Sequence, residues 1–356
     1  MADTAIENKT KAEAESRPYA SSWLDRFNAS LNRLPGPSWL YYLGIGSVLV
    51  LLQITVLWTE GAYSVEGFLA NHAFIAGLIP FLLALSLFLD NKAVAAFAAL
   101  RPILKAREEK CQRLEYQLTT LPARPTLLVS LSGVASIVFL NIVMNGFSDF
   151  GGLGDFPISR TLVYLTYIGT WWVLAAFLYH TVHQLRTIDL IYTHHSRVNL
   201  FKMRPLYGLS GVTALTGVSL TAITYGWMLI NPELWGNPIS MAIVLPITVL
   251  AFTTFAWPLL GIHRLLEEEK ARVLDQCSLR MEAAIAVLHQ RVDGGKLEGM
   301  DDLNKTIASL EIEQDLLEGI PTWPWRPDTV RLLITALALP LGLWLIQYVL
   351  QLVIGP

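Results

Sequence analysis

Seven stretches of this chain are apolar over a length that spans a lipid bilayer. A helix rises about 1.5 Å per residue and the hydrocarbon core is about 30 Å thick, so one crossing needs about 20 apolar residues. Backbone polar groups left unpaired in lipid are costly, and each stretch must therefore be a helix. The sequence predicts an all-α fold, a polytopic membrane helical bundle of seven transmembrane helices. The stretches cover residues 38–58, 73–89, 126–145, 161–182, 207–230, 239–262 and 329–354.

Positive charge is distributed unevenly among the segments that connect these stretches. Of the 26 Lys and Arg residues, 24 lie in the N-terminal tail and in the second, fourth and sixth connecting segments. The other three connecting segments hold only Arg160. Basic loops stay in the cytoplasm, so the pattern predicts an N-terminus inside and a C-terminus outside. We expect a multi-pass protein of the plasma membrane, or of the inner membrane in a bacterium.

The connecting segments divide the chain into four parts. Residues 1–37 are predicted to form a cytoplasmic tail with an interfacial helix, and residues 38–262 six transmembrane helices with cytoplasmic helical extensions. Residues 263–327 are predicted to form a cytoplasmic helical hairpin followed by a linker rich in Trp and Pro. Residues 328–356 form the predicted seventh transmembrane helix.

A short amphipathic helix is predicted within the tail, over residues 20–34. Its apolar residues recur at helical spacing, with charged residues on the other side. Such a helix lies on the inner leaflet of the membrane or packs on the protein's own cytoplasmic part, and the sequence allows both. The apolar residues are Trp23, Leu24, Phe27, Leu31 and Leu34.

Two of the transmembrane helices are expected to continue beyond the membrane. Residues 93–118 contain no Gly and a single proline, Pro102, and are rich in helix-forming residues. From residue 161 to residue 199 the chain contains no Pro and one glycine, Gly169. Both segments therefore predict cytoplasmic helical extensions.

The segment before the seventh stretch has the pattern of a helical hairpin. Leu274, Met281 and Leu288 repeat every seven residues with Cys277 and Ala284 between them, which is typical of a short coiled-coil seam. A second helix near residues 301–318 carries apolar residues on one face. We expect either a pair within one chain that covers the bundle ends or a contact between subunits. The apolar residues of the second helix are Leu303, Ile307, Leu310 and Leu317.

The predicted spans contain no acidic residue and no Lys. Ion-coupled transporters and voltage sensors depend on such charges, whereas a passive pore can be lined by neutral polar groups. In the last stretch, Gln347, Tyr348 and Gln351 share one helix face with Trp344. This face predicts either a water-filled path formed with other subunits or ordinary hydrogen bonding between helices.

Two histidines lie one helical turn apart near the end of the fourth stretch. His180 and His183 have the spacing of a pair that could ligate a metal or haem. The alternative is a pair of interfacial histidines on an amphipathic extension, because no Cys or carboxylate follows at a recognisable ligand spacing. The chain also lacks a nucleotide-binding glycine loop and a nucleophile elbow. We expect no catalytic site, no enzyme activity and no bound cofactor.

The segment Leu343-Trp344-Leu345-Ile346-Gln347-Tyr348, with Gln351 after it, places an aromatic residue and glutamines near the end of the last helix. Together with seven spans, an N-terminus inside and helices prolonged into the cytoplasm, this arrangement resembles the insect odorant and gustatory receptor superfamily of ion channels. The resemblance lies in the topology of the whole chain. It implies that the last helix lines a pore at the centre of a tetramer and that cytoplasmic helix ends join the subunits.

Three functional hypotheses follow. The first is an oligomeric ion channel, open to gating by a ligand, with Gln347, Tyr348 and Gln351 along the pore. The second is a membrane sensor or scaffold that binds a cytoplasmic protein through residues 263–320. The third is a membrane protein that binds haem or a metal through His180 and His183. The expected partners are the lipid bilayer, further copies of the chain and that cytoplasmic protein, but no nucleic acid.

Overall fold

The computed structural model describes residues 18–63, 70–104, 106–144, 153–195, 200, 206–231, 238–295, 298–322 and 335. This part of the chain is all-α, with nine α-helices and one short 3-10 helix, η1. They are α2 (Trp23–Asn32), α3 (Ser38–Thr59), α4 (Ala70–Leu100), η1 (Arg101–Ile103), α5 (Glu108–Thr119), α6 (Ala123–Met144), α7 (Pro157–His195), α8 (Leu206–Ile230), α9 (Pro238–Asp293) and α10 (Met300–Glu318).

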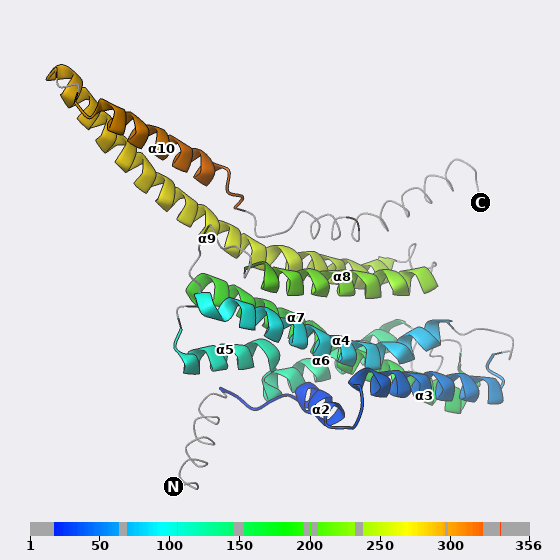
Figure 1. Cartoon of the computed structure of the whole chain (residues 1–356). Helices are drawn as coiled ribbons and strands as arrows, with labels where there is room; N and C mark the ends of the chain where they lie inside the picture. The colour runs from blue at the N-terminus through cyan, green and yellow to red at the C-terminus, as the bar shows by residue number, and fades with distance from the viewer. Residues whose placement is uncertain are drawn as a thin grey trace, which may run out of the picture.

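Five helices are long and apolar enough to cross a membrane: α3, α4, α6, α7 and α8. They contain the first five predicted stretches. The sixth stretch lies within α9, and the seventh lies outside the described residues apart from Thr335. Figure 1 shows α3, α4, α6, α7, α8 and the first part of α9 side by side in one bundle. The rest of α9 leaves the bundle together with α10, and we call this projecting pair the arm.

The helical extensions are present, with one correction. As expected, α7 is a single helix of 39 residues and α9 continues to Asp293. The extension after the second stretch is not one helix, because α4 ends at Leu100, η1 follows, and α5 starts at Glu108. Pro102 lies in η1 and lacks the backbone N–H that a continued helix would need. As expected, the helix does not end with the second stretch, and Asp90 is an interior residue of α4.

The ends of the bundle helices near α5 pack into one hydrophobic core. This core joins α4, α5, α7 and α8 to the base of the arm, where Leu266, Cys277 and Leu317 belong to it. Burial of this many apolar side chains is the main stabilising contribution to the packing of these helix ends. The largest fully buried side chains of this core include Phe97, Leu100, Leu118, Ile188 and Tyr192.

Helix α2 packs on the protein's own helices. Leu24 is 2% exposed, and the buried side chain of Asn28 donates to Ser86 Oγ on α4 (3.1 Å). Tyr42 on α3 donates its hydroxyl hydrogen to Asn28 Oδ1 (2.8 Å). Phe27 remains 37% exposed on the other side of α2. Helix α2 therefore contacts α3 and α4 directly, and both expectations for this amphipathic helix stay predictions. We refer to this end of the bundle as the α2 end.

Helices α6 and α7 cross with their backbones in contact at Gly133. A Cβ atom at this position would lie 2.6 Å from both Trp171 O and Ala175 Cβ, closer than such atoms approach. Small residues allow this kind of close approach between membrane helices. By contrast, a Cβ atom at Gly44 on α3 would meet nothing within 4 Å.

We predict that Gly133→Ala destabilises the protein by about 1–3 kcal/mol, because the added methyl group forces α6 and α7 apart. The matched control, Gly44→Ala, should leave stability unchanged or raise it slightly, since Ala is the better helix former. Thermal unfolding of the detergent-solubilised full chain measures both effects. Equal midpoints for the two variants would contradict the close crossing.

Candidate functional site

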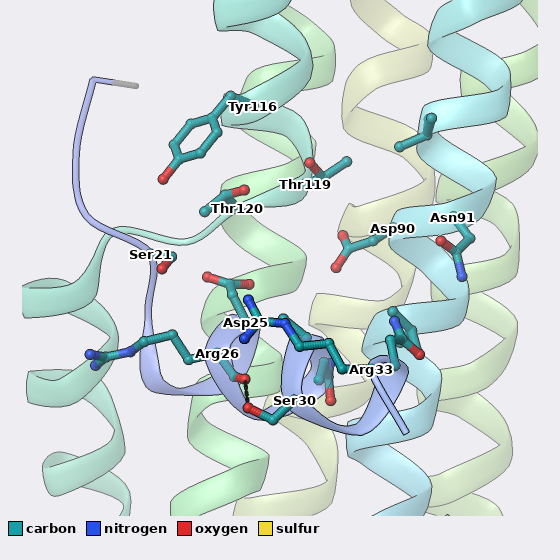
Figure 2. A pocket seen from close by; sticks show the side chains of 15 residues that line it. Ser21, Asp25, Arg26, Ser30, Arg33, Asp90, Asn91, Tyr116, Thr119 and Thr120 are labelled. Carbon is teal, nitrogen blue, oxygen red and sulfur yellow. Dashed lines mark hydrogen bonds between the residues drawn. The ribbon is translucent and has the colours of Figure 1, made fainter. Parts of the chain in front are cut away.

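A polar pocket of about 650 Å³ lies at the α2 end, between α2, α4 and the end of α5. Figure 2 shows Asp25, Arg26 and Arg33 on α2 and Asp90 and Asn91 on α4 around it. Tyr116, Thr119 and Thr120 line its remaining side. Acidic, basic, amide and hydroxyl groups thus meet in one hollow, which distinguishes it from the apolar surfaces of the bundle.

Asp25 fixes the start of α2 to the segment that connects α5 and α6. Its Oδ2 atom accepts hydrogen bonds from the backbone N–H of Ser22 (2.9 Å) and of Leu121 (3.0 Å). Ser22 caps the helix in return, because its Oγ accepts from the backbone N–H of Asp25 (3.3 Å). Ala123 N–H also donates to Ala20 O (3.0 Å). Burial raises the pKa of the Asp25 carboxyl above its usual range, although these hydrogen bonds oppose the shift.

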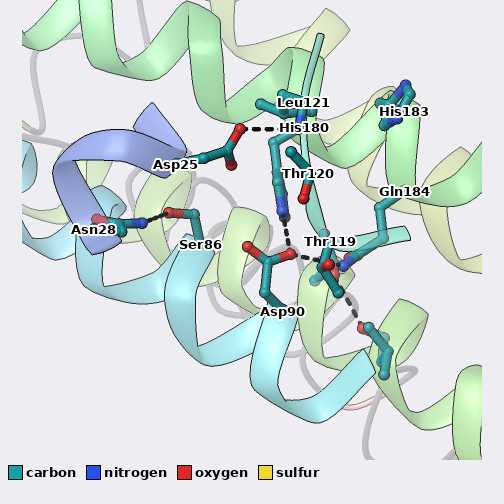
Figure 3. Close-up of polar contacts among 12 residues, drawn as sticks. Asp25, Asn28, Ser86, Asp90, Thr119, Thr120, Leu121, His180, His183 and Gln184 are labelled. Carbon is teal, nitrogen blue, oxygen red and sulfur yellow. Dashed lines mark hydrogen bonds and ion pairs between the residues drawn. The ribbon is translucent and has the colours of Figure 1, made fainter. Parts of the chain in front are cut away.

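A buried contact between His180 and Asp90 joins α7 to α4 beside this pocket. The Nε2–H of His180 donates to Asp90 Oδ1 (2.8 Å), and Gln184 Nε2 lies 3.4 Å from the same oxygen (Figure 3). The His180 side chain is 2% exposed and the Asp90 side chain 15% exposed. A carboxylate in this position fixes the orientation of the imidazole ring.

His183 belongs to a different set of contacts. Its Nε2–H lies 3.0 Å from Gln117 O and 3.1 Å from the Tyr19 hydroxyl, which itself donates to Thr120 O (2.8 Å). Burial raises the pKa of the Tyr19 hydroxyl above its usual range. His180 and His183 therefore bind separate partners. Within the described ranges, no group of three or more His, Cys, Asp or Glu residues is arranged to hold a metal.

The sequence did not indicate Asp90 as a partner of His180. The two residues are 90 positions apart, and Asp90 directly follows the second predicted stretch, residues 73–89. The available signal was the position of Asp90 on its helix. It shares one face of α4 with Ser86, Leu89 and Ala93, and these three residues are buried. The candidate pore residues Gln347, Tyr348 and Gln351 lie outside the described residues.

Comparison with known family models, curated proteins and solved structures finds no match to this chain.

We predict that His180→Ala destabilises the protein by about 3–5 kcal/mol, because it leaves the Asp90 carboxylate buried without its partner. His183→Ala should cost less, about 1–3 kcal/mol, since it removes hydrogen bonds to neutral groups. Unfolding of the full chain in mixed micelles compares the two variants.

The double variant Asp90→Asn with His180→Ala provides the control. It removes the buried charge together with its partner, so it should be more stable than His180→Ala alone. A double variant that is less stable than the single one would show that the two residues do not act as a pair.

Proposed function

We propose that this chain is a seven-span membrane protein with a cytoplasmic N-terminus, and that it works as a scaffold or sensor through its arm. Five candidate spans support membrane insertion. The distribution of Lys and Arg supports the orientation. In that orientation the α2 end, α5 and the arm lie in the cytoplasm.

The observation that carries this proposal is the continuity of α9. It runs without a break for 56 residues, from the sixth predicted span to the tip of the arm. α10 packs back along it, with Cys277 Sγ lying 3.5 Å from Leu310 O at the seam. Lys270 Nζ donates to Glu318 O (2.7 Å) and to Ile320 O (3.0 Å) at its base. A helix pair that is rigidly built into the bundle and extends away from it is suited to present a binding surface.

The arm has apolar side chains on the faces that point away from its own seam. Leu279 on α9 is 65% exposed, and Ile312 and Leu316 on α10 are 61% and 64% exposed. At 100° per residue, each lies nearly opposite the seam residues of its own helix. The arm therefore has two outward apolar faces on opposite sides.

The outward faces of α9 and α10 differ and lie on opposite sides of the arm. This arrangement favours contact between copies of the chain. If the outer face of α9 packs on the outer face of α10 in the next subunit, the contact is heterologous and repeats around a ring. We propose a homo-oligomer joined in this way, whose assembled arms bind a cytoplasmic protein.

The oligomer is tested with Leu279→Glu and Ile312→Glu, which place a charge in the proposed contact. We expect each variant to reduce the mass of the detergent-solubilised particle to that of a smaller assembly or a single chain, as measured by mass photometry. Ser278→Glu is the control, because it adds the same charge at an exposed position of α9 that does not share the face of Leu279. Unchanged mass in both apolar-to-Glu variants would exclude the arm as the subunit contact.

A second candidate function, an oligomeric ion channel, is favoured by the neutral polar face of the last predicted span and by the resemblance to the insect receptor channels. Gln347, Tyr348 and Gln351 would line the pore at the centre of the oligomer. No acidic residue or Lys is needed for such a pore.

We expect purified protein in a planar bilayer to conduct, and Gln347→Leu combined with Gln351→Leu to reduce or abolish the current. The apolar side chains would make the pore lining harder to wet. Leu345→Ile serves as the control, because it changes an apolar residue on the same span. Absence of conductance from the wild-type oligomer would count against the channel, and an unchanged current in the double variant would remove these residues from the pore.

A further inference from the structure

Two hollows follow one another along a single face of α4. The polar pocket is lined by Leu87, Asp90, Asn91 and Val94 of this helix. A second hollow, a groove of about 520 Å³ between α3 and α4, is lined by Gly77, Pro80, Phe81 and Ala84. These positions recur at intervals of three and four residues, so they share one face of the helix.

The two hollows meet at a contact between buried side chains. Tyr42 lines the groove, Asn28 lines the polar pocket, and the Tyr42 hydroxyl donates to Asn28 Oδ1 (2.8 Å). The site as a whole is therefore polar at the α2 end and apolar along the bundle. That is the polarity of a phospholipid whose headgroup lies at the membrane surface.

The polar pocket contains acidic and basic groups that can still form hydrogen bonds or ion pairs with a ligand. Oδ1 of Asp25 and Oδ2 of Asp90 accept no hydrogen bond from the residues that the structure describes, although both side chains are largely buried. Arg26 and Arg33 line the same pocket and are exposed. Figure 2 shows the two carboxylates facing the hollow between α2 and α4. A ligand that carries one cationic and one anionic group would pair with both the carboxylates and the guanidinium groups.

The groove is apolar and faces outward from the two candidate spans. Trp39 and Leu43 on α3 are 60% and 59% exposed, and Phe81 on α4 is 50% exposed. Gly46 brings α3 close to α4, since a Cβ atom there would lie 3.1 Å from Pro80 Cγ. Exposed aromatic and aliphatic side chains around such a groove suit an acyl chain from the surrounding bilayer.

We propose that these two hollows together bind one phospholipid with a phosphoethanolamine headgroup. A primary ammonium has three N–H donors for the carboxylate oxygens of Asp25 and Asp90, and the phosphate suits the guanidinium groups of Arg26 and Arg33. A quaternary ammonium has no N–H donor and prefers aromatic faces. An anionic headgroup without an amine would leave the carboxylates facing negative charge. The proposal rests on membrane insertion and is independent of the arm.

The first experiment compares headgroups on the wild-type chain. Delipidated full-length protein in detergent is unfolded thermally with added short-chain phosphatidylethanolamine, phosphatidylcholine or phosphatidylglycerol, or with free phosphoethanolamine. A ligand that binds only the folded state raises the midpoint. We expect the ethanolamine lipid to raise it most and free phosphoethanolamine to raise it less. Equal shifts for all three lipids would overturn the proposal, and stabilisation by free phosphoethanolamine without any by the lipid would overturn the assignment to a lipid.

The second experiment separates the two halves of the site. Arg26→Gln with Arg33→Gln should weaken the response to all three lipids, because it removes the two groups that hold the phosphate, whereas Arg113→Gln, an exposed arginine outside the pocket, should leave the response unchanged. Ser47→Phe fills the groove, so it should abolish the response to the lipid and retain the response to free phosphoethanolamine. Ser47→Ala should retain both responses.

Native mass spectrometry of the same variants provides a readout that does not depend on thermal stability. Unchanged binding of the ethanolamine lipid to the double arginine variant would overturn the headgroup site. A loss of the response to free phosphoethanolamine in Ser47→Phe would overturn the division between pocket and groove. Neither result depends on the mass photometry of the arm variants, so the two proposals can fail separately.

Discussion

The hydrogen bond between His180 and Asp90 is the contact on which the α2 end depends. It lies where α4 and α7 come together, and the pocket beneath α2 opens beside it. Asp25 ties α2 to the start of α6 at the same level. Buried polar groups need partners, so each of these side chains restricts where its neighbours can lie. These polar contacts therefore fix the arrangement of α2, α4, α6 and α7 at the α2 end.

The helices could be predicted from the sequence because each depends on residues that are close together in the chain. The absence of Pro between residues 161 and 199 accounts for the uninterrupted α7. Within the predicted seam of α9, Cys277 Sγ lies 3.5 Å from Leu310 O on α10. Pro102 is where the structure differs from the predicted helical extension of residues 93–118. It ends the regular helix within a segment whose composition otherwise favours one, and so separates α4 from α5.

The candidate site could not be predicted from the sequence because its contacts are not local. Helical periodicity shows which residues share a face, but it does not show which face of another helix lies opposite. Asp90 and His180 are 90 residues apart, and Tyr19 reaches Thr120 over 101 residues. The pattern of His180 and His183 predicted either a metal or haem pair or interfacial histidines, whereas the His180 side chain is 2% exposed and contacts Asp90. It could not show that each ring contacts a different partner.

The unbroken α9 also has a mechanical consequence. About 31 residues of this helix lie beyond the sixth predicted span, which corresponds to about 46 Å at 1.5 Å per residue. A tilt of about 10° in the membrane part of a stiff helix therefore displaces the arm tip by about 8 Å. Changes in bilayer thickness tilt membrane helices. If α9 crosses the bilayer as proposed, the arm converts small angular changes within it into displacements as wide as a helix-to-helix spacing.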